Sequence, residues 1–348
     1  MLAVFTASLA MVASATLSAA GPIHERQSFT PSAWDTWIWN NQSTNVCADG
    51  SMTGFAYNMH SGANDILIYF DGGGACWDTN SCFTNPTAFN LQGYTESSFQ
   101  GWTKTSLDSQ ILLTSRDPAR NNPWAGAHYV FVPYCTGDIH GGNNVVTYDG
   151  APAPIYHKGY SNFQTILQVV AGAVPYPQNV WITGTSAGCF GATLNYVAAR
   201  KAFPWSRIHL IGDSCETTPG FIGTKPSWKL TQPGGRDCPK CQPGEFNSFL
   251  PALSSANTGS RFGSISFASD GTLPGFMGAT MDSFTSIISG YFANVTKTTT
   301  NMAKTFTVTG EGHGVLYQTS PVSTTGATLA SWLATMKNLR SGSAYKSV

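Results

Sequence analysis

Short apolar runs, each followed by glycine or polar residues, recur along this sequence and alternate with amphipathic stretches. The runs have the length of buried strands and cover residues 65–70, 128–134, 179–183, 207–212, 264–268 and 305–309. Apolar residues recur at helical spacing over residues 161–170, 187–203 and 325–338. Strands that alternate with helices form a mostly parallel sheet flanked by helices. The sequence therefore predicts an α/β fold.

One region interrupts this alternation. Residues 217–262 are rich in Pro, Gly and Ser, and aromatic residues are scattered through them. A long irregular insertion in a compact domain is usually functional, so we expect either a lid or binding wall, or a surface loop held by disulfides. No repeat or linker divides the rest of the chain, so a single domain is expected over residues 21–348.

The balance of charge argues against polyanionic partners. The chain has a formal net charge of +0 at pH 7, and charged residues make up only 10% of it. Nucleic acids and anionic membrane surfaces attract clusters of Lys and Arg, so neither is an expected partner. A neutral surface rich in aromatic residues suits an uncharged or weakly charged ligand.

The N-terminus and the cysteines indicate an extracellular protein. Residues 1–20 are apolar and uncharged and end in small residues, which is typical of a secretory signal peptide. N-glycosylation sequons begin at Asn41 and Asn294. The eight cysteines are expected to form disulfides in an oxidising compartment. The pair Cys238 and Cys241 has no histidine nearby and no second pair at zinc-finger spacing, so no metal site is expected.

Ser186 lies in the stretch 182–190, which reads ITGTSAGCF and follows the strand predicted over 179–183. A serine between two glycines at a strand-to-helix turn is the nucleophile position of an α/β hydrolase, and an acid and then a histidine follow it on loops after later strands. Asp270 and His313 follow the last two predicted strands. Parallel strands bring their carboxyl ends to one edge of the sheet, so the three loops are expected to converge.

Each of these side chains has a role in acyl transfer. His313 would take the proton of Ser186 during attack, and Asp270 would orient the imidazole and stabilise its charged form. Asp213 also ends a predicted strand and is the alternative acid. His140 lies in a glycine-rich strand exit and is expected to line the substrate pocket, with an ordinary loop position as the alternative.

An oxyanion hole is also required. The backbone N–H of Ala187 follows the nucleophile and opens a predicted helix. Gly73 and Gly74 follow the strand over 65–70, and their N–H groups are expected to complete the hole.

Several stretches resemble, in order, those of the pectin acetylesterase family. The resemblance rests on residues 47–51 (CADGS), 54–57 (GFAY), 71–76 (DGGGAC), 132–135 (VPYC) and 184–188 (GTSAG). It implies an α/β-hydrolase-like fold and carboxylesterase activity.

The resemblance also bears on single residues. It implies that Asp213 is not the acid of the triad, and it implies disulfides joining Cys76 to Cys82 and Cys47 to Cys135. Trp77 stands later than the tryptophan that family members carry near the last glycine of this loop, and it is the candidate for a place beside the substrate. Cys189 stands where relatives often have glycine and receives no role.

The expected function is that of a secreted serine carboxylesterase that needs neither metal nor cofactor and acts as a monomer. Its expected substrate, on the resemblance, is an acetylated polysaccharide such as pectin. Two alternatives stay open: an esterase or lipase acting on lipid-like or aromatic esters, and a non-catalytic binding protein on a hydrolase scaffold.

Overall fold

The computed structural model of the protein describes residues 33–104, 111–298, 302–338 and 346–348. The predicted signal peptide, residues 1–20, lies outside the described residues.

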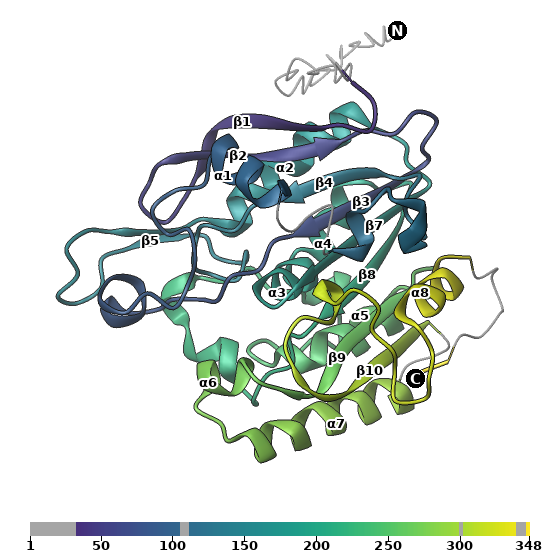
Figure 1. The fold of residues 1–348 in the computed structure, drawn as a ribbon. Coiled ribbons are helices and arrows are strands. Elements are labelled where there is room, and N and C mark those ends of the chain that lie inside the picture. Colours follow the sequence, from purple (N-terminus) through teal and green to yellow (C-terminus); the bar gives the residue numbers. More distant parts are fainter. Residues whose placement is uncertain (1–32, 105–110, 299–301, 339–345) are drawn as a thin grey trace, which may run out of the picture.

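One sheet of eight strands forms the centre of the molecule, in the order β1-β2-β4-β3-β7-β8-β9-β10 (Figure 1). The strands are β1 Trp37–Val46, β2 Met52–Asn58, β3 Asp65–Phe70, β4 His128–Val132, β7 Asn179–Thr185, β8 Arg207–Asp213, β9 Phe262–Asp270 and β10 Ala303–Gly312. β1 and β2 pair antiparallel, and the pairings from β4 to β10 are parallel. The predicted α/β fold is confirmed, and every apolar run named above falls on a strand.

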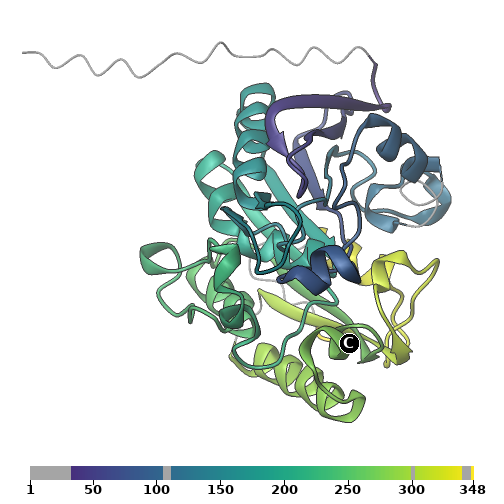
Figure 2. The ribbon, with the colours of Figure 1, turned by 90° about the vertical axis from the view of Figure 1, so that its left-hand side faces the viewer.

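The sheet is buried on both faces because successive strand residues point to opposite sides. In β3, Ile66, Ile68 and Phe70 belong to one hydrophobic core, whereas Leu67 and Tyr69 belong to another. Helices therefore have to cover both faces, as Figures 1 and 2 show.

The helices divide between these two cores. Residues of α2, α3, α4, α5 and α7 pack in the first core, and residues of α1 and α8 pack in the second. The helices are α1 Glu96–Trp102, α2 Gly159–Ala173, α3 Ala187–Leu194, α4 Tyr196–Ala202, α5 Phe249–Ala256, α6 Leu273–Met277, α7 Met281–Thr298 and α8 Leu329–Asn338. Two short strands, β5 Asn144–Val146 and β6 Ile155–His157, form a separate hairpin-like pair. Among the described residues, no helix combines the length and apolar character needed to cross a membrane.

Several elements differ from the prediction. Strands β1, β2, β5 and β6 and helices α1, α5 and α6 were not predicted, and three further elements differ as follows. The helix expected over 187–203 is two helices, α3 and α4, which are separated at Asn195, where the backbone has φ −91° and ψ 4°. The final helix begins at Leu329 rather than at residue 325. Helix α7 was not predicted, because Ser and Thr residues dilute its apolar pattern. Its buried side chains do recur at helical spacing; they are Phe284, Ile288, Phe292 and Val295.

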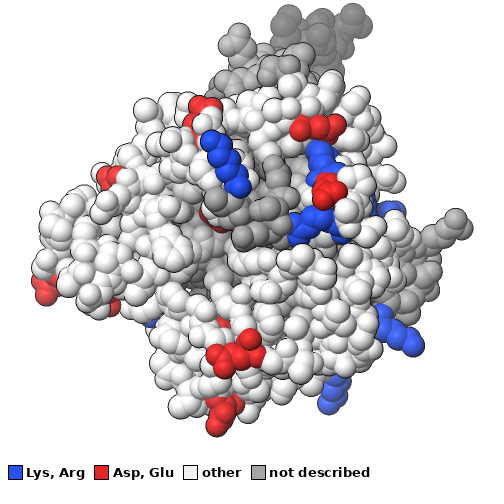
Figure 3. All heavy atoms as spheres, viewed as in Figure 1, with Lys and Arg blue, Asp and Glu red and all other residues white. Residues whose placement is uncertain are grey.

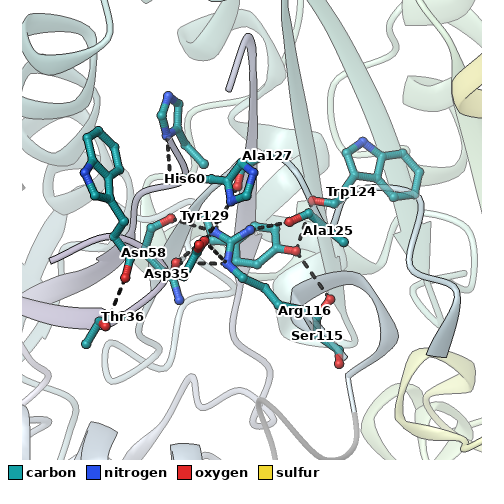
Figure 4. Close-up of polar contacts among 12 residues, drawn as sticks. Asp35, Thr36, Asn58, His60, Ser115, Arg116, Trp124, Ala125, Ala127 and Tyr129 are labelled. Atoms are coloured by element: carbon teal, nitrogen blue, oxygen red, sulfur yellow. Dashed lines mark hydrogen bonds and ion pairs between the residues drawn. The ribbon is translucent and has the colours of Figure 1, made fainter. Parts of the chain in front are cut away.

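The N-terminal strands are tied to the sheet by one arginine (Figure 4). The guanidinium of Arg116 contacts Asp35 Oδ1 at 2.9 Å, donates to Asn58 Oδ1 at 2.7 Å and lies 4.1 Å from the centre of the Tyr129 ring. The same Asp35 oxygen lies 2.7 Å from Nδ1 of His60. These contacts join the segment before β1 to the end of β2 and the start of β4.

The insertion over residues 217–262 packs against the body of the protein. It forms short 3₁₀ turns and α5, and its aromatic side chains Trp228, Phe246 and Phe249 are buried. The indole N–H of Trp228 donates to the carbonyl of Cys76 at 2.8 Å, which joins the insertion to the loop after β3. The insertion therefore packs beside that loop.

Candidate active site

Ser186 sits on a strained turn between β7 and α3. Its backbone has φ 57° and ψ −125°, a conformation that residues other than glycine rarely adopt. The flanking glycines are required by close packing: a Cβ on Gly188 would lie 2.0 Å from the Phe70 carbonyl oxygen, and one on Gly184 would lie 2.5 Å from the Gly188 backbone. The N–H of Ser186 donates to the Asp213 carbonyl at 2.9 Å. This is the geometry of a nucleophile elbow.

Asp270 and His313 meet at the same edge of the sheet. Asp270 ends β9, and its register partner Gly312 ends β10 immediately before His313. Asp270 Oδ2 lies 2.8 Å from His313 Nδ1, and Oδ1 accepts N–H groups of Thr272 and Leu273, each at 2.8 Å. The carboxyl is fully buried. Its three contacts, with His313, Thr272 and Leu273, fix its position. A carboxylate on Nδ1 places the donor proton there and leaves Nε2 free to accept one.

Ser186 and His313 line one cavity of about 700 Å³, together with the glycine loop that follows β3. This volume lies in the range of small-molecule sites. Within the described residues no hydrogen bond is formed by Ser186 Oγ. Hydrogen bonds between a nucleophile and its base often shorten only when substrate binds. The observation that relates Ser186 to His313 here is therefore that both line one cavity.

Asp213, the alternative acid, is occupied elsewhere. Its Oδ2 accepts the Thr185 hydroxyl at 2.8 Å and the N–H of Leu316 at 2.9 Å. Its Oδ1 accepts the Ser214 hydroxyl at 3.0 Å and the N–H of Val315 at 3.1 Å. Asp213 thus ties the elbow to the loop after His313, and it does not contact the imidazole.

Two of the three candidate oxyanion donors line the cavity, and the third follows Ser186 directly. Gly73 and Gly74 line it, with φ 139° and 76°, values that favour glycine. Ala187 lies at the N-terminus of α3, where backbone N–H groups have no helical partner. In the described part of the chain, no acceptor is paired with the N–H of any of these three residues.

The two predicted substrate-binding residues lie differently from the expectation. His140 is 1% exposed and does not reach the cavity; its Nε2 lies 2.8 Å from the Asp71 carbonyl oxygen, beneath the glycine loop. Positive φ values at Ile139 and His140 turn its side chain inward. Trp77 stands behind Phe276, a residue that lines the cavity, with 6.5 Å between their ring centres.

Sequence reasoning missed one wall of the cavity. That wall comes from the segment between the glycine loop and the end of α1, and its members are Thr87, Phe89, Asn90, Tyr94, Ser98 and Trp102. The segment carries no motif and little periodicity, so the sequence offered no signal for it. Tyr317, after β10, completes the lining.

The eight cysteines form four disulfides. Two join the pairs that the resemblance implied, Cys47 with Cys135 and Cys76 with Cys82. The residue without a role, Cys189, is joined to Cys215, so the disulfide links α3 to the end of β8 beneath the elbow. The fourth joins Cys238 and Cys241 within the insertion.

Two buried carboxyls near the site lack ionic partners among the described residues. Asp71 lines the cavity, and burial raises the pKa of its carboxyl to about 8. The hydrogen bond that it accepts from the Gly72 N–H lowers the pKa by less than burial raises it. Glu216 is 1% exposed, and within the part of the chain that the structure describes neither of its carboxyl oxygens has a hydrogen-bond partner. Burial, followed by the charges of Asp270 and Asp213, raises its pKa from 4.5 to about 8.

Glu216→Gln is expected to stabilise the protein at pH 8 relative to pH 5. The folded state keeps the Glu216 proton up to about pH 8, whereas the unfolded chain releases it near its ordinary value of 4.5. The contribution of this group to stability is therefore complete below about pH 4.5 and is lost as the pH rises through 8. The difference in melting temperature, variant minus wild type, should increase by about 2 °C or more between pH 5 and pH 8. A difference that does not change with pH would contradict the shift.

The fold and the elbow together define an α/β-hydrolase-like protein. A family model described as pectinacetylesterase matches residues 31–215, and the chain belongs to this family. The match ends after the elbow and β8, so Asp270 and His313 lie beyond it. The family and the curated relatives support a carboxylic ester hydrolase.

The relatives are palmitoleoyl-protein carboxylesterases. Notum2 of Xenopus laevis is 28% identical over 154 residues, which cover 43% of this chain and 29% of the relative. NOTUM of Homo sapiens is 27% identical over 152 residues, with 43% and 29% covered. An inactive relative, notum1b of Danio rerio, is 29% identical over 110 residues, which cover 32% of this chain and 74% of the relative. The chain thus spans less than a third of the length of the two active relatives.

Proposed function

We propose that the protein is a secreted serine carboxylesterase that removes acetyl groups from polysaccharide through an acyl-enzyme on Ser186. The observation that carries the proposal is that His313, paired with Asp270, lines the same cavity as a serine held on a strained elbow. Four disulfides and exposed side chains at the sequons of Asn41 and Asn294 support an extracellular location.

In the proposed reaction, Ser186 Oγ forms a bond to the ester carbonyl carbon while His313 Nε2 accepts its proton. The oxyanion of the tetrahedral intermediate accepts bonds from the N–H groups of Gly73, Gly74 and Ala187. Each such donor is worth about 3–4 kcal/mol of barrier. The bond to the leaving alkoxide then breaks, and the imidazolium donates its proton to that oxygen.

The second half of the reaction reverses these roles. His313 takes a proton from water, and the resulting hydroxide attacks the acyl carbon. Collapse of this second intermediate breaks the bond to Ser186 Oγ, which recovers its proton, and releases the carboxylic acid. Throughout, Asp270 stabilises the positive charge on the ring.

A small apolar recess beside Ser186 supports an acetyl group as the acyl part. It has a volume of about 20 Å³, and its lining includes Ile139, Phe190, Phe221, Leu273, Phe276 and Met277. A recess of this size holds about one water molecule, which matches a methyl group. A long acyl chain would need these side chains to move, so the recess favours acetyl esters over the lipid-like esters of the alternative function.

Hydrolysis of p-nitrophenyl esters tests this function. We expect kcat/KM to fall by about tenfold or more from acetate to butyrate, because extra methylenes overfill the recess. Phe276→Ala enlarges the recess and should bring the butyrate rate to within a few-fold of the acetate rate. Phe89→Ala, in the main cavity but outside the recess, is the matched control and should keep the preference for acetate.

Two outcomes would contradict the proposal. Faster cleavage of long-chain esters by the wild-type protein would favour a lipase-like function. Absence of hydrolysis on every ester would favour the non-catalytic binding protein; the relative from Danio rerio is itself named as inactive.

A further inference from the structure

A second cavity lies next to the catalytic one. It has a volume of about 590 Å³ and shares two lining residues, Phe89 and Asn90, with the cavity that holds Ser186. Residues 87–90 therefore form a ridge between the two cavities. The acetyl recess accounts for the acyl part of a substrate, but it leaves the second cavity without an occupant.

The ridge is fixed to the glycine loop of the active site. The N–H of Phe89 donates to the Gly73 carbonyl at 2.9 Å, and the Thr87 hydroxyl donates to the Ala75 carbonyl at 2.6 Å. The side-chain amide of Asn90 donates to the Tyr134 carbonyl at 3.3 Å. These bonds hold the second cavity at a set position relative to the oxyanion donors, so a ligand that spans the ridge is aligned with Ser186.

The lining of the second cavity combines aromatic rings with neutral polar groups. Phe83 and Tyr156 are half-buried in its wall, and Phe89 exposes 73% of its side chain on the ridge. Asn90 and Gln92 present amides beside these rings. An apolar surface with a few convergent hydrogen-bonding groups suits a ligand that has both apolar faces and hydroxyl groups, which is the chemistry of sugar rings.

The charges favour an uncharged sugar polymer. Among the described residues that line the two cavities, none is Lys or Arg, whereas the carboxyl of Asp49 lines the second cavity. Carboxylates are bound through Arg and Lys, and like charges across an interface are unfavourable. Figure 3 shows one face of the molecule, most of which is uncharged, with side chains of both signs gathered at its upper right.

We propose that the second cavity binds consecutive sugar rings of a neutral acetylated polysaccharide while the acetyl ester of a neighbouring ring lies at Ser186. The proposal rests on the proposed esterase function and sharpens its substrate class, because it favours a neutral backbone over the polyuronate backbone of pectin. The ridge at Phe89 is the point at which the polymer passes from one cavity to the other.

The test compares polymer and small ester in the same variants. Tyr156→Ala removes a ring that lines only the second cavity, and we expect kcat/KM on acetylated glucomannan to fall by about tenfold. The same variant should hydrolyse p-nitrophenyl acetate within twofold of wild type. Gln92→Ala, an exposed residue of the same cavity, should give a smaller loss on the polymer alone. Tyr176→Ala, exposed to 75% and in neither cavity, is the control.

The remaining outcomes separate this proposal from the proposed function. Unchanged polymer rates in both cavity variants would overturn the second site, and so would equal losses on polymer and small ester in a folded Tyr156→Ala protein. Acetylated polygalacturonate cleaved as fast as acetylated glucomannan of equal acetyl content would overturn the preference for a neutral backbone. If the wild-type protein hydrolyses neither p-nitrophenyl acetate nor polymer, the esterase function itself fails.

Discussion

Replacing Ser186 by Ala is expected to lower kcat for p-nitrophenyl acetate by about 10⁶-fold, because the neighbouring hydroxyl, that of Thr185, is buried and donates to Asp213. His313→Ala should give a loss of similar size, since the serine is a weak nucleophile without its base. The double variant should lose no more than either single variant, because the two groups act as one unit. If the loss of kcat in the double variant equalled the product of the losses in the two single variants, the two residues would act independently.

Folding must be separated from chemistry in this experiment. Ser186 Oγ forms no hydrogen bond within the described residues, so its removal should leave the melting temperature within about 1 °C of wild type. Ala at this position keeps the strained backbone, with φ 57°, as it is. A variant that loses activity and also unfolds would say nothing about the nucleophile, so melting curves accompany the kinetics.

The sequence could place the three candidate catalytic residues on one edge because strand exits are readable from local pattern. Ser186, Asp270 and His313 each follow an apolar run, and a parallel sheet brings such exits together. The choice between Asp213 and Asp270 could not be made from the runs alone, since both residues end neighbouring strands. It depends on the register that pairs Gly312 with Asp270 and on the hydrogen bonds that already occupy Asp213.

Other features depend on contacts between distant residues, which local pattern does not encode. His140 follows a strand at the expected edge, yet a turn with positive φ at two residues buries it under the glycine loop. The ridge at Phe89 is placed by its bond to Gly73, and the recess is closed by Phe221 from the insertion. Neither segment has a periodic pattern from which its position could be predicted.

Asp270→Asn and Asp213→Asn are expected to affect different properties. The first should lower turnover, and the second should lower stability. In Asp270→Asn, an amide in place of the Oδ2 carboxylate oxygen no longer favours the Nδ1–H tautomer of His313 and carries no charge to stabilise the imidazolium. We expect kcat to fall by about 10⁴-fold, the size of the loss that the same substitution causes in the triad of a serine protease. The Thr272 and Leu273 N–H groups can still bond to the remaining oxygen, so the fold should persist.

Asp213→Asn leaves the imidazole and its partner unchanged but removes acceptors from a fully buried network. The two carboxylate oxygens now accept four hydrogen bonds, among them those from the N–H groups of Val315 and Leu316. One amide oxygen cannot accept all four. Each buried donor left unpaired costs about 1–3 kcal/mol, so the free energy of unfolding should fall by about 2–4 kcal/mol. Activity per folded molecule should stay within about tenfold of wild type, because Asp270 still holds His313. A loss of turnover in Asp213→Asn with normal melting, together with an active Asp270→Asn protein, would transfer the role of the acid to Asp213.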